Sequence, residues 1–213
     1  SIVSGLARYV VVVASNTTSA QLVRDNYANQ NRPGFEWAWL SPAVFADGAA
    51  AMVLANDAPD GFGLLATGYE IHPSIELVRF PGGGGLNPTC VLNGSEHAYV
   101  MDAKAVSTVF EPLMRRNIEM MHDRTGMTVS EFDWVFVHQA NGPLVRAFGE
   151  TLGLPSERVP VNIDRYGNTS SASTLLLLDE ARKSGRVQSG QKALFLWIGA
   201  GVGAMNGFAV FRL

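Results

Sequence analysis

The sequence predicts a protein of the α/β class, because segments typical of buried strands alternate with segments typical of helices. Short runs of branched apolar residues, such as "YVVVV" and "ALFLWI", have the composition of buried strands. An internal repeat supports the same class. The segment "KSGRVQSGQKALFLWIGAGVGAMNGFAVFRL" near the end resembles "IVSGLARYVVVVAS" and "FADGAAAMVLA" near the start. Each copy has a Ser-Gly, a strand, a turn rich in glycine and alanine, and a second strand.

The first part of the chain is expected to consist of strands and loops. Residues 8–15 predict a fully buried strand. Residues 16–33 are polar and predict a loop that can hold one helix. Residues 45–57 predict a turn leading into a strand, and residues 61–71 predict its antiparallel neighbour. Residues 73–94, with "PGGGG" and "NPTC", predict a loop.

The second part of the chain is expected to alternate helices with strands. Apolar side chains recur at helical spacing across 102–124, which predicts a long amphipathic helix. The elements expected after it are a strand at 133–138, a helix at 141–152, a short strand within 158–168, a helix at 170–184, and strands at 192–198 and about 206–212. The 170–184 helix has an almost entirely apolar middle, so we expect it to be buried on most sides.

Composition excludes several classes of protein. The net charge is −3 without a basic run, so we expect no nucleic-acid partner. No apolar run reaches the roughly 18 residues that predict a membrane span. The single cysteine, Cys90, excludes an internal disulfide framework and fits a reducing, cytoplasmic location.

The repeat also predicts where a nucleophile belongs. Asn168 precedes the 170–184 helix and lies 17 residues before Gly185 (185 − 168). The equivalent point, 17 residues before Gly5, falls about 13 residues ahead of Ser1. If a pseudo-twofold axis relates the copies, that point faces Asn168. A helix N-terminus lowers the pKa of a thiol. We therefore expect the attacking group in a segment preceding residue 1.

Five motifs together resemble the β-ketoacyl-acyl-carrier-protein synthase III family of the thiolase superfamily. They are "VHQAN", "VNIDRYGNTSSAS", "LDEARKSGRVQSGQ", "GAGVGAMNG" and "FADGAAA", and the resemblance is strongest from about residue 133. It implies a layered αβαβα fold, usually a homodimer, of which this chain is the C-terminal two-thirds. Residues 1–92 would then be the remainder of the N-terminal half, and residues 93–213 the C-terminal half.

The resemblance also implies the site residues. His138 and Asn168 match the catalytic histidine and asparagine of the family, and Asn141 matches the asparagine that supports them. The glycine-rich turn at Gly201, Val202 and Gly203 matches the backbone of the oxyanion hole. The nucleophile of the family is a cysteine at a buried helix start, expected here before Ser1. No metal or redox cofactor is implied.

The activity implied is a decarboxylative Claisen condensation in fatty acid or polyketide biosynthesis. Acyl-CoA, malonyl-CoA or malonyl carrier protein, and acyl carrier protein are the implied substrates and partners. The donors of His138 and Asn168 would stabilise an enolate oxygen. The chain departs from the family where basic groups usually contact phosphates, at Gly142, Pro143, Trp39 and Thr108. These departures favour a specialised synthase.

Two other functions stay open. An acyltransferase of the same fold would pass acyl groups to oxygen or nitrogen, with His138 as general base. A non-catalytic partner subunit of a ketosynthase heterodimer would need no nucleophile, although His138 and Asn168 are both present in this chain.

The other reactive residue types are better explained by structure. Cys90 and "PGGGG" fall in a predicted loop without the signature of a nucleophile or a phosphate site. His72, His97 and His122 lack the spacing of metal ligands. Arg115 and Arg116 are expected to be solvated, and Asp47 to shape a turn. Ser170 or Thr169 is expected to cap the following helix, which would leave Asn168 free.

Overall fold

The computed structural model describes residues 4–20, 39–79, 100–201 and 203–213. Its main elements, in chain order, are β1 (Tyr9–Asn16), β2 (Gly48–Ala55), β3 (Gly63–His72), α2 (Ala103–Thr125), β6 (Trp134–Val137), α3 (Gly142–Thr151), α5 (Ser173–Lys183), β7 (Lys192–Gly201) and β8 (Gly203–Arg212). Shorter elements lie between them: η1 (Thr18–Ala20), α1 (Leu40–Val44), β4 (Val78–Arg79), β5 (Val100–Met101), η5 (Val129–Glu131), η6 (Ser156–Arg158), α4 (Ile163–Tyr166) and η7 (Ser170–Ala172).

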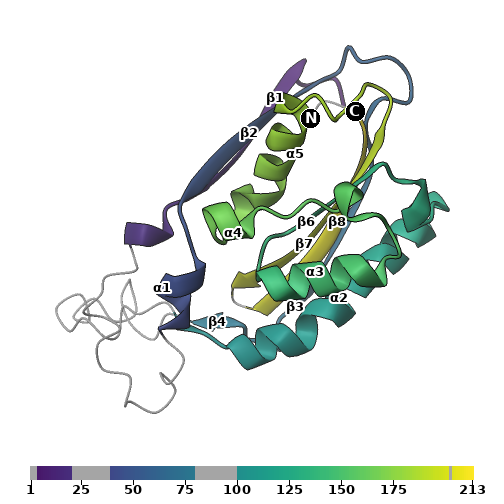
Figure 1. Ribbon diagram of the computed structural model, residues 1–213. Helices are drawn as coiled ribbons and strands as arrows, with labels where there is room; N and C mark the ends of the chain where they lie inside the picture. The colour runs from purple at the N-terminus through teal and green to yellow at the C-terminus, as the bar shows by residue number, and fades with distance from the viewer. Residues whose placement is uncertain (1–3, 21–38, 80–99, 202) are drawn as a thin grey trace.

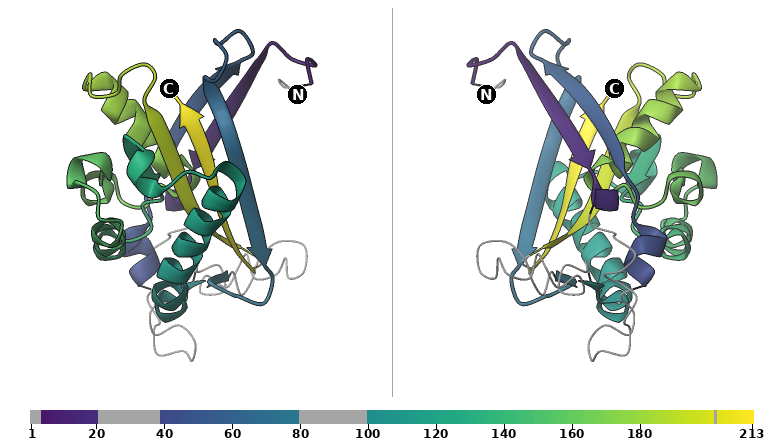
Figure 2. Two further views of the ribbon diagram at one scale, coloured as in Figure 1. Left: turned by 90° about the vertical axis from the view of Figure 1, so that its right-hand side faces the viewer. Right: turned by 90° about the vertical axis from the view of Figure 1, so that its left-hand side faces the viewer.

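These elements are stacked in layers of alternating type. A ribbon of β1 and β2 lies on one side of α5, and a sheet lies on the other side (Figures 1 and 2). The sheet has the strand order β3-β8-β7-β6. Helices α2 and α3 cover its far face (Figure 1). The predicted α/β class is confirmed, and among the described residues no helix is both long and apolar enough to cross a bilayer.

Successive side chains of a strand point to opposite faces of the sheet. Because apolar residues occur on both faces here, both faces are covered. Val135 and Val137 of β6 pack into the core that faces α2 and α3. Trp134 and Phe136 point the other way, toward α5. On that face the rings of Trp134 and Phe136 stack with centroids 5.8 Å apart. All four residues are buried, so β6 is a fully buried strand, as predicted for 133–138.

The predicted helices form close to the expected positions. Helix α2 begins after Asp102, whose carboxylate accepts the N–H of Ala105, and it ends at Gly126 in the left-handed conformation. The helices predicted at 141–152 and 170–184 correspond to α3 and to η7 followed by α5. The short strand predicted within 158–168 is wrong. That segment forms η6 and α4 instead, and only Asn168 makes an isolated bridge, to Phe45.

The pairing predicted for residues 61–71 is also wrong. Strand β3 does not pair with β2; it pairs with β8, with Thr67 opposite Ala209. Period-two patterns predict which face of a strand is apolar but carry no information about its partner. The division at residue 92 stays a prediction, although β3 lies before it in the chain and belongs to the sheet of the second part.

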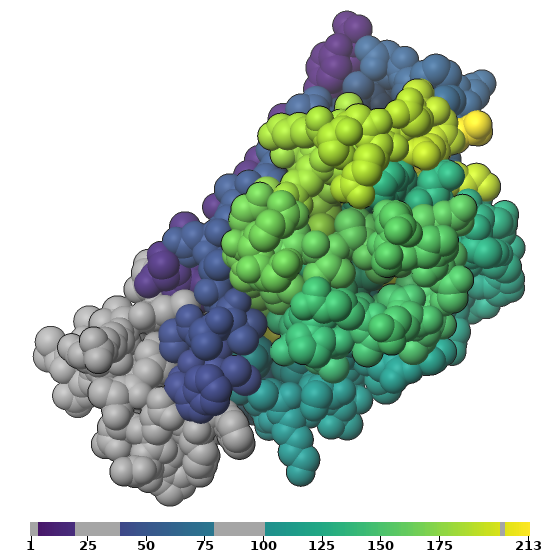
Figure 3. All heavy atoms as spheres, viewed as in Figure 1, coloured from purple at the N-terminus to yellow at the C-terminus, as the bar shows by residue number. Residues whose placement is uncertain are grey.

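The burial predicted for residues 8–15 is the third correction. Strand β1 forms as expected, but Val11 is 59% exposed and Val13 is 66% exposed. Within the described residues β1 pairs with β2 and with no other strand. The ribbon runs along one border of the molecule (Figure 3). Branched apolar residues therefore form the strand here without being covered.

The internal repeat corresponds to a repeated structure. Strand β1 pairs antiparallel with β2, and β7 pairs antiparallel with β8. Each pair contains the strand, turn and second strand that the two sequence copies share. The α5 helix contacts β2 on one side and β6 on the other, between the two pairs.

Candidate active site

His138 lies where β6 ends. Its backbone N–H donates to the carbonyl of Leu196 at 2.8 Å, so the residue continues the ladder between β6 and β7. Its Nδ1 lies 2.7 Å from the hydroxyl oxygen of Ser173, the first residue of α5. Parallel strands place their carboxyl ends at one edge of a sheet, where sites commonly form. The imidazole is therefore held between the end of a strand and the start of a helix.

The imidazole of His138 is neutral at pH 7. Burial lowers the pKa of His138 from 6.5 to about 4, because a charged ring loses its hydration there. The backbone carbonyl of Ser170 acts in the opposite direction and raises the pKa slightly. A neutral imidazole carries one N–H, which can donate to an oxygen, and one bare nitrogen, which can accept a proton.

Asn168 is fixed by hydrogen bonds at its side chain and its backbone. Its Oδ1 accepts the N–H of Ser170 at 2.8 Å, and its Nδ2 donates to the carbonyl of Ala140 at 3.4 Å. The cap predicted for Ser170 or Thr169 is thus wrong, because Asn168 itself accepts from the helix start. Binding the oxygen fixes where the nitrogen points. Residue 140 belongs to the "HQAN" motif, so the amide of Asn168 is tied to the His138 segment.

The backbone around Asn168 is held by the "FADG" segment. The N–H of Asn168 donates to the carbonyl of Val44 at 2.8 Å, and its carbonyl accepts from Ala46 at 3.0 Å. Gly167 lies against Ala46 so closely that an added Cβ would come within 2.9 Å of the Ala46 Cβ. Asp47 accepts the backbone N–H and the hydroxyl of Ser19. Asp47 thus ties this segment to η1, and its pKa is lowered mainly by the hydroxyl of Ser19. The turn-shaping role of Asp47 stays a prediction.

Gln139 joins the histidine segment to the turn before Asn168. It is fully buried. Its Oε1 accepts the backbone N–H groups of Asn162 at 3.1 Å and Ile163 at 3.3 Å, and its Nε2 donates to the carbonyl of Val137 at 2.9 Å. No motif in the sequence predicted this role. The available signal was a long polar side chain placed directly after a buried strand.

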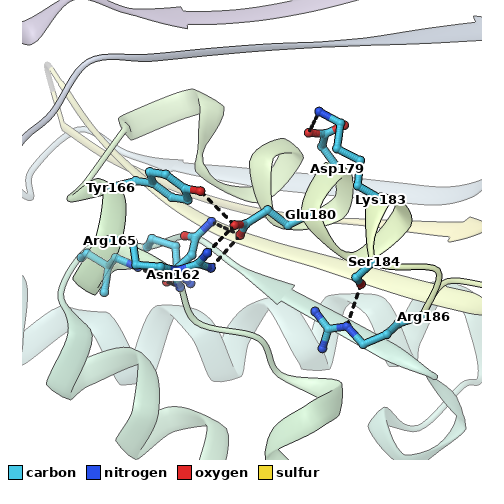
Figure 4. A network of polar contacts seen from close by, with 10 residues as sticks. Asn162, Arg165, Tyr166, Asp179, Glu180, Lys183, Ser184 and Arg186 are labelled. Atoms are coloured by element: carbon cyan, nitrogen blue, oxygen red, sulfur yellow. Dashed lines mark hydrogen bonds and ion pairs between the residues drawn. The ribbon is translucent and has the colours of Figure 1, made fainter.

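Glu180 of α5 holds the same turn from its outer side (Figure 4). Its carboxylate accepts from Asn162 Nδ2 at 2.8 Å, from Tyr166 at 3.1 Å, and from Arg165 at 2.8 Å. Three side chains of one short segment thus converge on a single carboxylate. The segment that leads to Asn168 is clamped between Gln139 and Glu180.

Asn141 forms the N-cap of α3. Its Oδ1 accepts the N–H of Leu144 at 3.2 Å, and it lines the same cavity as His138. Capping accounts for the side-chain oxygen of Asn141. The supporting role implied by the resemblance stays a prediction.

The turn proposed as an oxyanion hole joins β7 to β8. Gly201 is paired with Gly203 across the hairpin, and Val202 lies outside the described residues. Gly203 has φ +102°, and an added Cβ would lie 2.8 Å from the carbonyl oxygen of His72. Only glycine fits such an approach. A donor role for Gly201, Val202 or Gly203 stays a prediction.

A cavity of about 940 Å³ connects these groups. His138, Asn141 and Asn168 are among the residues that line it. Most of the other lining residues are apolar and come from the ribbon, from α2 and from the sheet, among them Val12, Met52, Phe110, Phe195 and Trp197. The two predicted catalytic residues therefore line one largely apolar space. Their catalytic roles stay a prediction.

Among the described residues, His72, His122, Arg115 and Arg116 do not line this cavity. Cys90, His97 and the "PGGGG" loop lie outside the described residues. His72 contacts Asn206, and His122 contacts the carbonyl of Met127. Arg115 pairs with Glu111, and Arg116 with Glu70, all on the surface, as expected of solvated charges. Within the described ranges, no group of three or more acidic, histidine or cysteine side chains could hold a metal ion.

Comparison with known proteins agrees with the resemblance that the sequence motifs carry. Residues 122–213 match the family described as 3-Oxoacyl-[acyl-carrier-protein (ACP)] synthase III C terminal. The chain is 34% identical over 212 residues to β-ketoacyl-[acyl-carrier-protein] synthase III of Xanthomonas campestris, covering 93% of this chain and 57% of that protein. It is 31% identical over 207 residues to synthase III 2 of Deinococcus radiodurans, covering 93% of this chain and 55% of that protein.

The solved structures below have the same enzyme name as the relatives found by sequence. The structure of 3-oxoacyl-(acyl carrier protein) synthase III from Pseudomonas aeruginosa superposes with a TM-score of 0.79 at 28% identity, covering 99% of this chain and 60% of that one. The enzyme from Thermus thermophilus gives a TM-score of 0.80 at 27% identity, with coverage of 100% and 61%. The chain thus spans somewhat more than half the length of these relatives. It has the thiolase-like fold, and over 93% of its length it is similar to proteins named β-ketoacyl-[acyl-carrier-protein] synthase III.

Proposed function

We propose that the chain is the C-terminal part of a condensing enzyme that joins an acyl thioester to a malonyl thioester by decarboxylative Claisen condensation. The observation that carries the proposal is the pair of side chains in one cavity: a neutral His138 and a buried Asn168. Two hydrogen-bond donors in an apolar space suit the stabilisation of an enolate oxygen.

The reaction takes place in two stages. In the first, a cysteine thiolate attacks the carbonyl carbon of the acyl thioester, and the donor thiolate leaves. We infer that this cysteine lies in a segment outside the 213 residues. The apolar cavity beside α5 supports this inference, since it offers space for a further element next to His138 and Asn168.

In the second stage, the malonyl group loses CO₂. The electron pair of the broken C–C bond passes to the thioester carbonyl, which becomes an enolate. Donors from His138 and Asn168 stabilise its oxygen; one such donor is worth about 3 kcal/mol of barrier. The enolate carbon attacks the acyl-cysteine, and the oxyanion formed there is held by backbone N–H groups near Gly201, Val202 or Gly203. The cysteine thiolate then leaves.

The substrates and partners follow from this chemistry and are part of the proposal. We propose acyl-CoA as the first substrate, malonyl-CoA or malonyl carrier protein as the second, and acyl carrier protein as the partner. The steps above require no metal or redox cofactor. A cytoplasmic homodimer is the proposed working form.

Intact-mass measurement tests the proposal. The protein, together with its preceding segment, is incubated with acetyl-, longer acyl- and malonyl-CoA, and its mass and the released CO₂ are followed. We expect acylation of the protein, then CO₂ release and a 3-oxoacyl product. Acylation without CO₂ release would favour the acyltransferase, and no acylation would favour the non-catalytic partner subunit. His122→Ala, a surface histidine variant, serves as the control that should behave as the wild type.

A further inference from the structure

Two asparagines are buried between helix α2 and the sheet. Asn117 of α2 and Asn206 of β8 are both 0% exposed. The other buried residues of α2 are apolar, namely Phe110, Leu113, Met114 and Met121. An amide loses its hydration when it is buried, whereas an apolar residue of similar size would fill the same space without that loss. Packing alone therefore does not account for the two amides.

Asn117 joins the two strands of the β7–β8 hairpin. Its Nδ2 donates to the carbonyl of Trp197 in β7 at 3.0 Å, and its Oδ1 accepts from Nδ2 of Asn206 in β8 at 2.6 Å. The sulfur of Met114 lies 3.8 Å from the same Nδ2 and is a weak acceptor. Oδ1 of Asn206 lies 2.7 Å from Nε2 of His72, the last residue of β3. One line of hydrogen bonds thus connects β7, α2, β8 and β3.

The direction of each hydrogen bond follows from the backbone carbonyl at one end of the line. A carbonyl only accepts, so Asn117 turns its nitrogen toward Trp197 and its oxygen toward Asn206. Asn206 then presents its nitrogen to Asn117 and its oxygen to His72, and Nε2 of His72 donates. The carboxylate of Glu70 also accepts a hydrogen bond from Asn206. All four polar atoms of the two amides therefore have a partner.

The hairpin has few other side chains that define its pairing register near the turn. Four of the nine residues 199–207 are glycine, and two are alanine. Glycine-rich strands are prone to slip, since few side chains distinguish one register from the next. In the observed register Asn206 lies opposite Ile198, and Gly207 lies opposite Trp197. A slip of one residue would turn the side chain of Asn206 away from α2.

The turn of this hairpin borders the cavity. Ala200, near the end of β7, lines the cavity. On the other side of the turn, His72 pairs with Ala204, and the carbonyl oxygen of His72 would lie 2.8 Å from a Cβ at Gly203. His72 therefore holds the start of β8 with its backbone and, through Asn206, with its side chain.

We propose that Asn117, Asn206 and His72 are positioning residues that fix the register of the β7–β8 hairpin and thereby the place of its turn beside the cavity. The fixed register stands on these contacts alone. Its consequence for catalysis rests on the proposed function, in which backbone N–H groups of this turn hold the oxyanion. The acyl carbonyl also becomes an oxyanion when the cysteine attacks it in the first stage. Such donors act only from a fixed position, so a shifted turn should slow self-acylation.

Hydrogen exchange followed by mass spectrometry tests the register, on the protein together with its preceding segment. Asn117→Leu keeps the volume but removes both contacts to the hairpin, and we expect the amides of residues 198–207 to exchange at least about tenfold faster than in the wild type. Met121→Ala is the matched control. Met121 is equally buried, lies one turn further along α2, and has its hydrogen-bonded neighbour, Thr125, in the same helix. Exchange in β6 should change no more in Asn117→Leu than in Met121→Ala.

A second pair of variants decides the register if Asn117→Leu fails to fold. His72 is only half-buried, so replacing it disturbs the core less. His72→Leu removes the donor to Asn206 and should speed exchange at residues 203–207, whereas His72→Gln keeps a donor and should stay near the wild type. The proposal is overturned if hairpin exchange is unchanged in Asn117→Leu or, should that variant not fold, in His72→Leu. An equal rise in Met121→Ala also overturns it.

The activity is a separate measurement. With acetyl-CoA, self-acylation of Asn117→Leu should be roughly tenfold slower or more, while CO₂ release by the acylated protein changes less. Met121→Ala should acylate at the wild-type rate. Equal rates of self-acylation in Asn117→Leu and the wild type would overturn the consequence for catalysis. If the wild type does not acylate itself, the proposed function fails, and the exchange result still decides the register.

Discussion

The side chains of His138 and Asn168 are each held by hydrogen bonds within the protein, and both residues line the cavity. Nδ1 of His138 is held by Ser173, and Oδ1 of Asn168 is held by the N–H of Ser170. Such fixed partners orient a donor before the substrate arrives, so little reorganisation is needed during the reaction. Three predictions follow from the chemistry and the conformation of single residues.

Removing either catalytic donor should slow condensation and spare acylation. In His138→Ala or Asn168→Ala we expect condensation to fall about 10²–10³-fold, because one enolate donor is lost. Self-acylation should continue, since the nucleophile is elsewhere. Mass spectrometry of the acyl-enzyme and an assay of released CO₂ measure the two steps. Equal loss of both steps would show that these residues do not act on the enolate.

The free energy of unfolding should depend on pH in part because of His138. Its pKa is about 4 in the folded protein and 6.5 ordinarily. Between these values the unfolded chain binds a proton that the folded chain does not. The free energy of unfolding should therefore decrease as pH falls from 6.5 toward 4, by at most roughly 3 kcal/mol. Urea unfolding at pH 7, 6, 5 and 4.5 measures this slope.

The comparison variant for this slope is His138→Gln, which has no titrating ring at position 138. Its stability should depend less on pH between 6.5 and 4, while His122→Gln should keep the wild-type slope. An identical slope in wild type and His138→Gln would mean that the ring is not desolvated.

Gly167 should not tolerate a side chain. It has φ +68° and ψ −169°, a conformation that favours glycine, and a Cβ there would meet Ala46 and the carbonyl of Val44. We expect Gly167→Ala to cost about 3 kcal/mol of unfolding free energy. Gly185 also has a positive φ, +71°, but open space around it. Gly185→Ala should therefore cost only about 1 kcal/mol. Equal losses, measured by urea unfolding, would show that the contact with Ala46 does not matter.

At the scale of elements, the site depends on a turn that has little regular structure. Residues 162–167 contain only the short helix α4, yet they place Asn168. Gln139 accepts from the backbone at the start of this turn, and Glu180 accepts from three of its side chains (Figure 4). The strand predicted here is absent because the hydrogen bonds of the segment go to side chains and to Val44–Ala46 rather than to a neighbouring strand.

Loss of the Glu180 carboxylate should loosen this turn. Glu180→Ala leaves Asn162, Arg165 and Tyr166 without their shared acceptor, and we expect a loss of about 1–3 kcal/mol of unfolding free energy. Glu180→Gln should cost less, since one acceptor oxygen is kept. Urea unfolding provides the measurement. Asp179→Asn is the matched control, because Asp179 makes one exposed pair with Lys183 that is worth under about 0.5 kcal/mol. If both positions cost the same, Glu180 does not hold the turn.

At the scale of the whole molecule, the ribbon of β1 and β2 is the least covered layer (Figures 1 and 3). Val11 and Val53 face each other across it and are 59% and 63% exposed. A two-stranded ribbon is only marginally stable on its own, and unpaired apolar strands attract other strands. The same ribbon forms part of the wall of the cavity with His138 and Asn168. Val12 and Met52, which line the cavity, alternate with the exposed Val11 and Val53, so the ribbon presents one face to the cavity and the other to the outside.

The chain should associate through this ribbon. We expect concentration-dependent self-association in sedimentation velocity, and Val11→Lys and Val53→Lys should each reduce it by placing a charge on the apolar face. Ser130→Lys adds the same charge on an exposed surface away from the ribbon and should have no effect. Unchanged association in both valine variants would place the contact elsewhere.

The sequence by itself determined the class of fold, the positions of the long helices and of most of the strands, and the candidate site residues His138 and Asn168. These follow from local patterns and from motifs, which the chain carries wherever it is placed. Only the tertiary structure decided that β3 pairs with β8 and that β1 is exposed. It also decided that Gln139, Glu180, Ser173 and the Val44–Ala46 backbone hold the segments of the two proposed catalytic residues. Those relations join residues distant in sequence. Their physical basis is a hydrogen bond or a packing contact made only when the layers come together, so no local pattern records them.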